Sequence, residues 1–152
     1  SALGARFYDS DHEIVRAAAM SIEEIFERYG EPHFREGERR VMARLLSGPP
    51  AVLATGGGAY LDDATRSLMR SRAHTVWLKV DLDTLVQRTS KRGGRPLLAT
   101  GDPRKKLAEL MDIRYPVYAE ADSTVESGDG PHERVVNAIL ETLRAHRVLA
   151  EP

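Results

Sequence analysis

The sequence has 152 residues, and its 22 lysines and arginines nearly balance its 23 aspartates and glutamates, for a formal net charge of −1. This length favours one domain with its own core, and the charge balance argues against a nucleic-acid binder that depends on basic excess. Because there is no cysteine, disulfides, thiol catalysis and zinc–thiolate sites are excluded. No apolar run approaches the ~20 residues needed to cross a bilayer, and no signal peptide is recognisable. We expect a cytoplasmic monomer that binds neither nucleic acid nor membrane.

The first third of the chain predicts one short strand followed by helices. Residues 7–8 form a brief strand that ends in the acidic triplet Asp9–Asp11. From His12 to Leu46 apolar residues recur at helical spacing. Ser21, with Glu24 three residues later, matches a capping box and predicts the start of a second helix in this region.

The rest of the chain alternates strands with helices. Strands are predicted at Ala51–Ala54, Thr75–Val80 and Ser123–Glu126, helices at Asp62–Arg72, Asp81–Arg88, Pro103–Tyr118 and Pro131–Arg147, and a basic, glycine-rich loop at Ser90–Asp102. This alternation is typical of an α/β fold, a parallel sheet with helices on both faces. In such sheets ligands bind beyond the carboxyl ends of the strands. The acidic triplet and the glycines Gly56–Gly58 both lie at such ends.

The glycine triplet follows the buried strand Ala51–Ala54 directly. A tight turn from strand to helix accounts for it. So does a nest of backbone N–H groups that binds a carboxylate or a phosphate. The triplet alone leaves both interpretations open.

Two carboxylates, Asp9 and Asp11, are spaced i, i+2 after the first strand. Asp11 fits the N-cap position of the helix that follows. If both residues continue the strand, their side chains point to the same side. Such a pair suits magnesium or the recognition of hydroxyl groups, and within an α/β fold we favour this second interpretation.

Several arginines admit both a structural and a functional interpretation. Arg35 and Glu38 are spaced as an ordinary surface ion pair, yet an arginine held by a neighbouring acid also binds carboxylates bidentately. The loop around Lys91–Arg95 is either a solvated loop or a mobile basic loop that closes over ATP. Arg114 lies near a predicted helix end, where it would complement the helix dipole.

Taken in order, the segments FYDSD, SIEEIF, FREGE, TGGGA, RPLL and RYPVY resemble those of shikimate kinase, a family of small P-loop kinases of aromatic amino-acid biosynthesis. The likeness runs from about Leu3 to the last helix, and the ordered series is far more specific than any one motif. It implies a three-layer sandwich like that of P-loop NTPases and nucleoside monophosphate kinases. Residues 1–152 would form one domain, with a shikimate-binding helical region at 12–46 and a lid at 90–102.

The resemblance also implies an activity and roles on the acid side of the site. The γ-phosphoryl group of MgATP would pass to the 3-hydroxyl of shikimate, giving shikimate 3-phosphate and ADP. Asp9 would help to hold magnesium. Asp11 would bind the shikimate hydroxyls and assist deprotonation of the attacking one. Arg35 and Arg114 would clamp the carboxylate, with Glu38 orienting Arg35.

Further roles follow from the same resemblance. Gly57 and Gly58 would offer backbone N–H groups to the bound acid. Arg95, in the lid, would stabilise charge on the transferred phosphoryl group. Arg88 would pack against adenine, and the loop at Gly130–Pro131 would edge the same pocket.

One family element does not occur in the sequence, the phosphate-binding motif GxxxxGK[ST]; TGGGAYLDD lacks its lysine and hydroxyl. In the family this loop precedes the FYDSD strand, so on the order of 25 residues are expected to be missing. We favour an omitted N-terminal segment over a shortened paralogue. In the family the strand lost with it lies between those of TGGG and TVWLKV, which would each lack a ladder partner. We expect the 152 residues alone to be inactive.

Two alternatives remain open at this point. One is another small-molecule kinase of the same fold, such as a gluconate kinase. The paired arginines Arg35 and Arg114 argue for shikimate, because a carboxylate clamp fits this acid. The other is a non-catalytic module that binds the acid and has lost its handling of ATP. Calorimetry on the full gene product would distinguish the module, which would bind the acid without a response to nucleotide.

Overall fold

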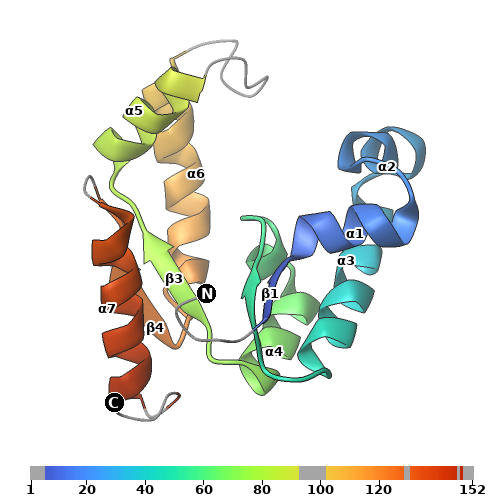
Figure 1. Ribbon diagram of the computed structural model, residues 1–152. Helices are drawn as coiled ribbons and strands as arrows, with labels where there is room; N and C mark the ends of the chain where they lie inside the picture. The colour runs from blue at the N-terminus through green and yellow to red at the C-terminus, as the bar shows by residue number, and fades with distance from the viewer. Residues whose placement is uncertain (1–5, 93–101, 129–130, 147, 149–152) are drawn as a thin grey trace. The chain divides into compact units, whose positions relative to one another are not determined.

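The computed structural model describes residues 6–92, 102–128, 131–146 and 148 of the chain (Figure 1). It divides into two compact units, Ser1–Ala73 and His74–Pro152. Each unit contains one pair of parallel strands with helices packed beside it, so each can be described by itself.

The first unit is built around the strands β1 (Arg6–Asp9) and β2 (Ala51–Ala54), which pair in parallel from Arg6 opposite Ala51 to Asp9 opposite Ala54. Its helices are α1 (Ser10–Ala18), α2 (Ile22–Tyr29), α3 (Glu31–Leu46), the short 3₁₀ helix η1 (Ala59–Leu61) and α4 (Asp63–Arg72). Because the two strands are parallel and end in register, their carboxyl ends bring the start of α1 beside the glycine triplet.

The beginning of α1 differs from the prediction. The N-cap is Asp9, whose Oδ1 accepts a hydrogen bond of 3.0 Å from the backbone N–H of Asp11. Asp11 is therefore in the first helical turn, and it neither caps the helix nor continues the strand. Asp9 and Asp11 are not a same-side pair on one strand, because the strand ends at Asp9. The prediction at Ser21 is confirmed: its Oγ accepts from the N–H of Glu24 at 3.1 Å and caps α2.

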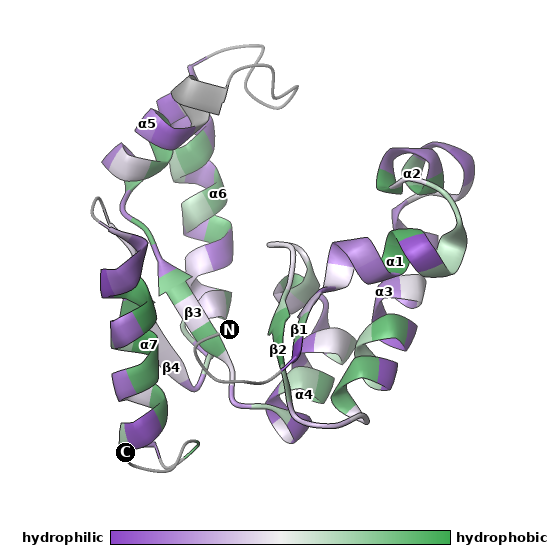
Figure 2. Cartoon of the chain, viewed as in Figure 1, coloured by the Kyte–Doolittle hydropathy of each residue, from purple (hydrophilic) through white to green (hydrophobic). Residues whose placement is uncertain are grey.

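A small hydrophobic core joins the first three helices. It consists of Ile14 of α1, Ile25 of α2, and Phe34 and Val41 of α3, all at least nine-tenths buried. Figure 2 shows hydrophobic residues alternating with hydrophilic ones along α1 and α3, as expected of helices with one buried face. This core fixes α3 against α1, and so it fixes the position of Arg35, the residue after Phe34.

The second unit has the strands β3 (Val76–Lys79) and β4 (Ser123–Glu126), paired in parallel from Val76 opposite Ser123 to Lys79 opposite Glu126. Its helices are α5 (Leu82–Arg92), α6 (Pro103–Tyr118) and α7 (His132–Ala145). α5 packs on α6, and α7 packs on β4. α5 continues to Arg92, so it includes the first residues of the predicted loop.

The two strand pairs differ from the single sheet that we expected. Among the described residues, β2 pairs only with β1, and β3 pairs only with β4. The resemblance implies one sheet with a further strand between β2 and β3, and this strand order stays a prediction. Of the helices that the structure describes, none is long and apolar enough to cross a membrane.

Candidate active site

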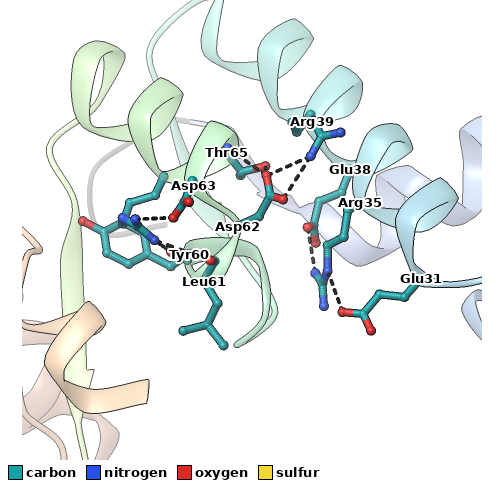
Figure 3. Close-up of polar contacts among 10 residues, drawn as sticks. Glu31, Arg35, Glu38, Arg39, Tyr60, Leu61, Asp62, Asp63 and Thr65 are labelled. Atoms are coloured by element: carbon teal, nitrogen blue, oxygen red, sulfur yellow. Dashed lines mark hydrogen bonds and ion pairs between the residues drawn. The ribbon is translucent and has the colours of Figure 1, made fainter. Parts of the chain in front are cut away.

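Arg35, on α3, is held by two glutamates of its own helix (Figure 3). Its Nη1 donates to Oε1 of Glu38 at 2.8 Å, and its Nε lies 3.5 Å from Oε1 of Glu31. The Glu38 side chain is only 1 % exposed, whereas that of Arg35 is 21 % exposed. A buried carboxylate thus fixes one edge of a guanidinium that is still accessible. Arg35 and Glu38 therefore form more than a surface ion pair, because the Glu38 side chain is buried.

The glycine triplet lies directly against this guanidinium. A Cβ at position 58 would sit 2.2 Å from Nη2 of Arg35 and 2.8 Å from its Cζ. The backbone of Gly58 has φ −79° and ψ −19°, which any L-residue adopts. Glycine is therefore needed at position 58 for space rather than for its backbone conformation, since only a residue without a side chain lets Arg35 approach so closely.

Asp11 lies against the same triplet from the side of α1. A Cβ at Gly56 would be 3.4 Å from Oδ2 of Asp11. Burial raises the pKa of the Asp11 carboxyl above its usual value, and the charge of Asp9 raises it further, while Arg35 opposes both effects. An acid, a guanidinium and a glycine-lined backbone therefore meet at the carboxyl ends of β1 and β2.

Glu38 belongs to the same electrostatic cluster. Burial raises its pKa, the pairing with Arg35 lowers it, and the charges of Asp11 and Asp62 raise it again. On balance the pKa of Glu38 is raised, so the pairing with Arg35 offsets only part of the cost of desolvating this carboxylate. Removal of Arg35 would leave this carboxylate buried without its partner.

Asp9 is exposed at the edge of the cluster and uses one carboxylate oxygen as a helix cap. Among the residues that the structure describes, no group of three or more histidines, aspartates or glutamates could hold a metal ion. A hard oxygen donor at the site fits magnesium, which keeps most of its waters when few protein ligands are available. Asp9 therefore fits as a single protein ligand or as a ligand to a bound water.

Arg114 belongs to the second unit and Arg35 to the first, so each is described in its own surroundings. Arg114 forms a side-chain hydrogen bond with Tyr118 one turn later, and burial raises the pKa of that tyrosine against the effect of Arg114. The hydroxyl of Tyr115 donates to the carbonyl of Val80, and its ring lies edge-on to Trp77 with centroids 4.8 Å apart. The RYPVY segment is thus anchored where β3 ends.

Arg88 and Pro131 also belong to the second unit. Nη2 of Arg88, on α5, donates to the carbonyl of Gly128 at 3.2 Å. Gly128 belongs to the connection between β4 and α7, and Pro131 is the N-cap of α7. This hydrogen bond brings Arg88 close to the connection between β4 and α7, which the resemblance assigns, together with Arg88, to the adenine pocket. Arg95 and Gly130 lie outside the described residues, as does most of the predicted lid.

The ion pair between Arg39 and Asp62, in the first unit, was not predicted from the sequence. Nη1 of Arg39 lies 3.0 Å from each carboxylate oxygen of Asp62, which caps α4 (Figure 3). The spacing of Arg39 one turn after Arg35 placed it on the same helix face. Its partner is 23 residues away, and no local pattern connects the two.

The comparison with known families decides what this cluster belongs to. The family model described as "Shikimate kinase" matches residues 1–144, nearly the whole chain. The chain belongs to the shikimate kinase family. As a member of that family, the protein is an ATP-dependent phosphotransferase, as the six ordered motifs predicted.

Curated relatives and solved structures agree with the family. The chain is 52 % identical over 140 residues to the shikimate kinase of Bradyrhizobium diazoefficiens, covering 92 % of this chain and 68 % of the relative. It is 54 % identical over 142 residues to that of Caulobacter vibrioides, covering 93 % and 71 %. Shikimate kinase from Acinetobacter baumannii in complex with shikimate superposes with a TM-score of 0.84 at 37 % identity, covering 96 % of this chain and 82 % of that one. These matches confirm an α/β fold with short parallel strands.

Proposed function

We propose that the protein transfers the γ-phosphoryl group of MgATP to the 3-hydroxyl of shikimate, giving shikimate 3-phosphate and ADP in aromatic amino-acid biosynthesis. One observation carries the assignment of the acid site: the Arg35 guanidinium, fixed by buried Glu38, and the Asp11 carboxylate both lie against the glycine triplet. We assign residues 12–46 to the acid-binding helical region of a single domain, with a lid at 90–102. The complete fold on this assignment is a three-layer sandwich around one parallel sheet.

The substrate carboxylate binds to Arg35. The planar guanidinium presents N–H groups in a fixed fork. The pairing with Glu38 holds that fork in one orientation before the substrate arrives. Gly57 and Gly58 supply backbone N–H groups on the side of the substrate that faces the triplet. On the family resemblance, Arg114 of the RYPVY segment would be the second guanidinium of the clamp. Two cations on one carboxylate distinguish this acid from neutral sugars.

Asp11 is the base in this mechanism. The proton of the 3-hydroxyl passes to a carboxylate oxygen of Asp11 as the hydroxyl oxygen attacks the γ-phosphorus. A bond forms between that oxygen and phosphorus, the bond from phosphorus to the β–γ bridging oxygen breaks, and ADP leaves with the electron pair. The raised pKa of Asp11 makes it a stronger base than an exposed carboxylate.

The nucleotide side involves fewer of the described residues. Asp9 would hold the magnesium ion, which neutralises charge on the phosphates when it is bound. Arg88, bonded to the Gly128 carbonyl, and Pro131 would border adenine. Arg95 would reach the transferred phosphoryl group from the lid.

The first test is turnover by the product of the whole coding region, followed by ADP release in a coupled assay. We expect ADP release that depends on shikimate, with gluconate inactive. Calorimetry should show binding of both shikimate and nucleotide. Turnover of gluconate in preference to shikimate would favour the other kinase class. Binding of shikimate with no response to nucleotide would favour a non-catalytic module.

A second prediction concerns the 152 residues by themselves. They contain no GxxxxGK[ST] segment, and this loop supplies the backbone N–H groups and the lysine that position the phosphates. We therefore expect a protein made of these residues alone to release no ADP above background in the same assay. Full activity would contradict the role that we give to the phosphate loop.

The third prediction is the pH dependence of kcat/KM for shikimate. Protonation of Asp11 removes the base, so activity falls as pH decreases through its pKa. Because burial raises that pKa, the fall in activity on the acid side of the profile should lie at higher pH than for an ordinary carboxylate. Asp11→Asn has no carboxylate at this position, so its residual activity should lack that fall. A fall that persists unchanged in Asp11→Asn would show that another group is the base.

A further inference from the structure

The ion pair between Arg39 and Asp62 joins the middle of α3 to the start of α4. One guanidinium nitrogen, Nη1, is within 3.0 Å of both carboxylate oxygens. The Arg39 side chain is 36 % exposed and that of Asp62 is 19 % exposed. The pair is thus partly shielded from solvent, unlike the neighbouring pair Arg40–Glu36, whose side chains are 78 % and 53 % exposed.

Asp62 is itself fixed by the helix that it caps. Its Oδ2 accepts from the N–H of Thr65 at 3.0 Å and from the Thr65 hydroxyl at 2.9 Å. Thr65 is fully buried. Burial alone would raise the pKa of Asp62, but the hydrogen bonds from Thr65 and Arg39 outweigh it and lower the pKa. Asp62 is therefore an ionised group with a defined position, and it gives Arg39 a rigid partner.

The segment between the glycine triplet and α4 is short and stiff. Gly58 immediately precedes η1, and Asp62 immediately follows it. The N–H of Leu61 bonds to the Gly58 carbonyl at 3.2 Å, and the N–H of Asp62 bonds to the Ala59 carbonyl at 3.3 Å. Ala59 and Tyr60 are buried. A change in the position of Asp62 would therefore move Gly58 as well, because the residues between them are buried or hydrogen-bonded.

α3 contacts this segment at both ends. Arg35 lies against Gly58 at one end, and Arg39, one helical turn later, binds Asp62 at the other. Two points of attachment from one helix define both the distance and the direction of the segment. The same segment carries the Gly58 backbone beside the guanidinium that binds the substrate acid.

We propose that Arg39 is a positioning residue: through Asp62 it fixes the glycine triplet against Arg35 and so sets the affinity for the substrate carboxylate. This inference rests on the proposed function, because it names a second determinant of the same site. Arg39 acts through Asp62 and η1, and it makes no direct contact with the substrate in this role. Its effect should therefore appear in shikimate binding and leave ATP binding unchanged.

The test uses Arg39→Ala and Asp62→Asn in the product of the whole coding region. Asparagine at position 62 still caps α4 but loses its charge, so helix stability is largely retained. Each variant should raise the KM for shikimate about tenfold, because small displacements of binding groups are costly. The KM for ATP should stay within about twofold of the wild type. Arg40→Ala, which removes the exposed pair on the same helix, is the matched control and should change neither constant.

A second readout separates positioning from general loosening of the fold. The methyl ester of shikimate lacks the charge that the clamp binds, so calorimetry should show that Arg39→Ala weakens shikimate binding but not the already weak binding of the ester. The double variant should be no worse than either single variant, since both break the same link. Equal losses for acid and ester, or unchanged shikimate affinity in Arg39→Ala while Arg35→Ala still weakens binding strongly, would overturn the inference alone. Failure of the wild type to bind shikimate would overturn the proposed function with it.

Discussion

Replacing Arg35 with alanine is expected to raise the KM for shikimate by about two to three orders of magnitude, because the carboxylate loses charge-assisted hydrogen bonds worth roughly 1.5–3 kcal/mol each. The KM for ATP should change by less than about twofold, since Arg35 lies in the acid-binding region. Steady-state kinetics with each substrate varied in turn measures both. A comparable rise in both constants would place Arg35 outside the acid site.

The Arg35→Ala variant needs a control for stability, because it leaves Glu38 buried and without its partner. Loss of one member of a buried pair is destabilising by itself. Arg35→Lys supplies that control. Lysine returns a positive charge to Glu38 but not the planar fork, so thermal stability should recover while shikimate affinity stays low. If lysine restores affinity, a point charge suffices and the bidentate geometry is not the determinant.

The elements were largely predictable because their ends carry local signals. The strands at Ala51–Ala54 and Ser123–Glu126 and the helix at Pro103–Tyr118 have the predicted bounds. Proline at the first helical turn and caps such as Ser21 act within a few residues, so sequence patterns capture them. The start of α1 was predicted wrongly because the strand was expected to continue through Asp11. Asp9 ends the strand and caps the helix, as the hydrogen bond from the Asp11 N–H to its carboxylate shows.

The site was predictable in its motifs and not in its contacts. Arg35 and Glu38 are three residues apart, so their pairing follows from helix geometry. The approach of Arg35 to Gly58 joins residues more than twenty positions apart, and it depends on how α3 packs beside the strands. The sequence led us to expect bare N–H groups at the triplet. The structure adds a steric reason for glycine at position 58.

This steric reason makes a second strong prediction, for Gly58→Ala. The added Cβ would lie 2.2 Å from Nη2 and 2.9 Å from Nη1 of Arg35, so the guanidinium has to move. The backbone conformation at position 58 suits alanine, so the strain falls on the Arg35 side chain, which Glu38 still holds. The melting temperature should therefore fall less than in Arg35→Ala, whereas the Kd for shikimate should rise about a hundredfold, as a displacement of about 1 Å can cost that much. Thermal unfolding and calorimetry on one preparation measure both.

Two other glycines provide control variants for Gly58→Ala. At Gly48 a Cβ would meet the Leu45 carbonyl at 3.6 Å and the Arg44 carbonyl at 3.9 Å, both ordinary contacts, so Gly48→Ala should leave shikimate binding unchanged. At Gly56 a Cβ would be 3.4 Å from Oδ2 of Asp11. Gly56→Ala should therefore have a smaller effect, which appears in kcat because the base is displaced.

The decisive experiment combines Gly58→Ala with Arg35→Ala. If the methyl group acts by displacing the guanidinium, it has nothing to displace once Arg35 is alanine, and the second substitution should add almost nothing to the loss of affinity. If alanine at position 58 instead prevents the backbone N–H from reaching the acid, the two losses should add, because the N–H and the guanidinium then bind independently. Strongly non-additive losses of affinity in the double variant would support the steric role of Gly58. Additive losses would show that the substitution acts through the backbone N–H groups.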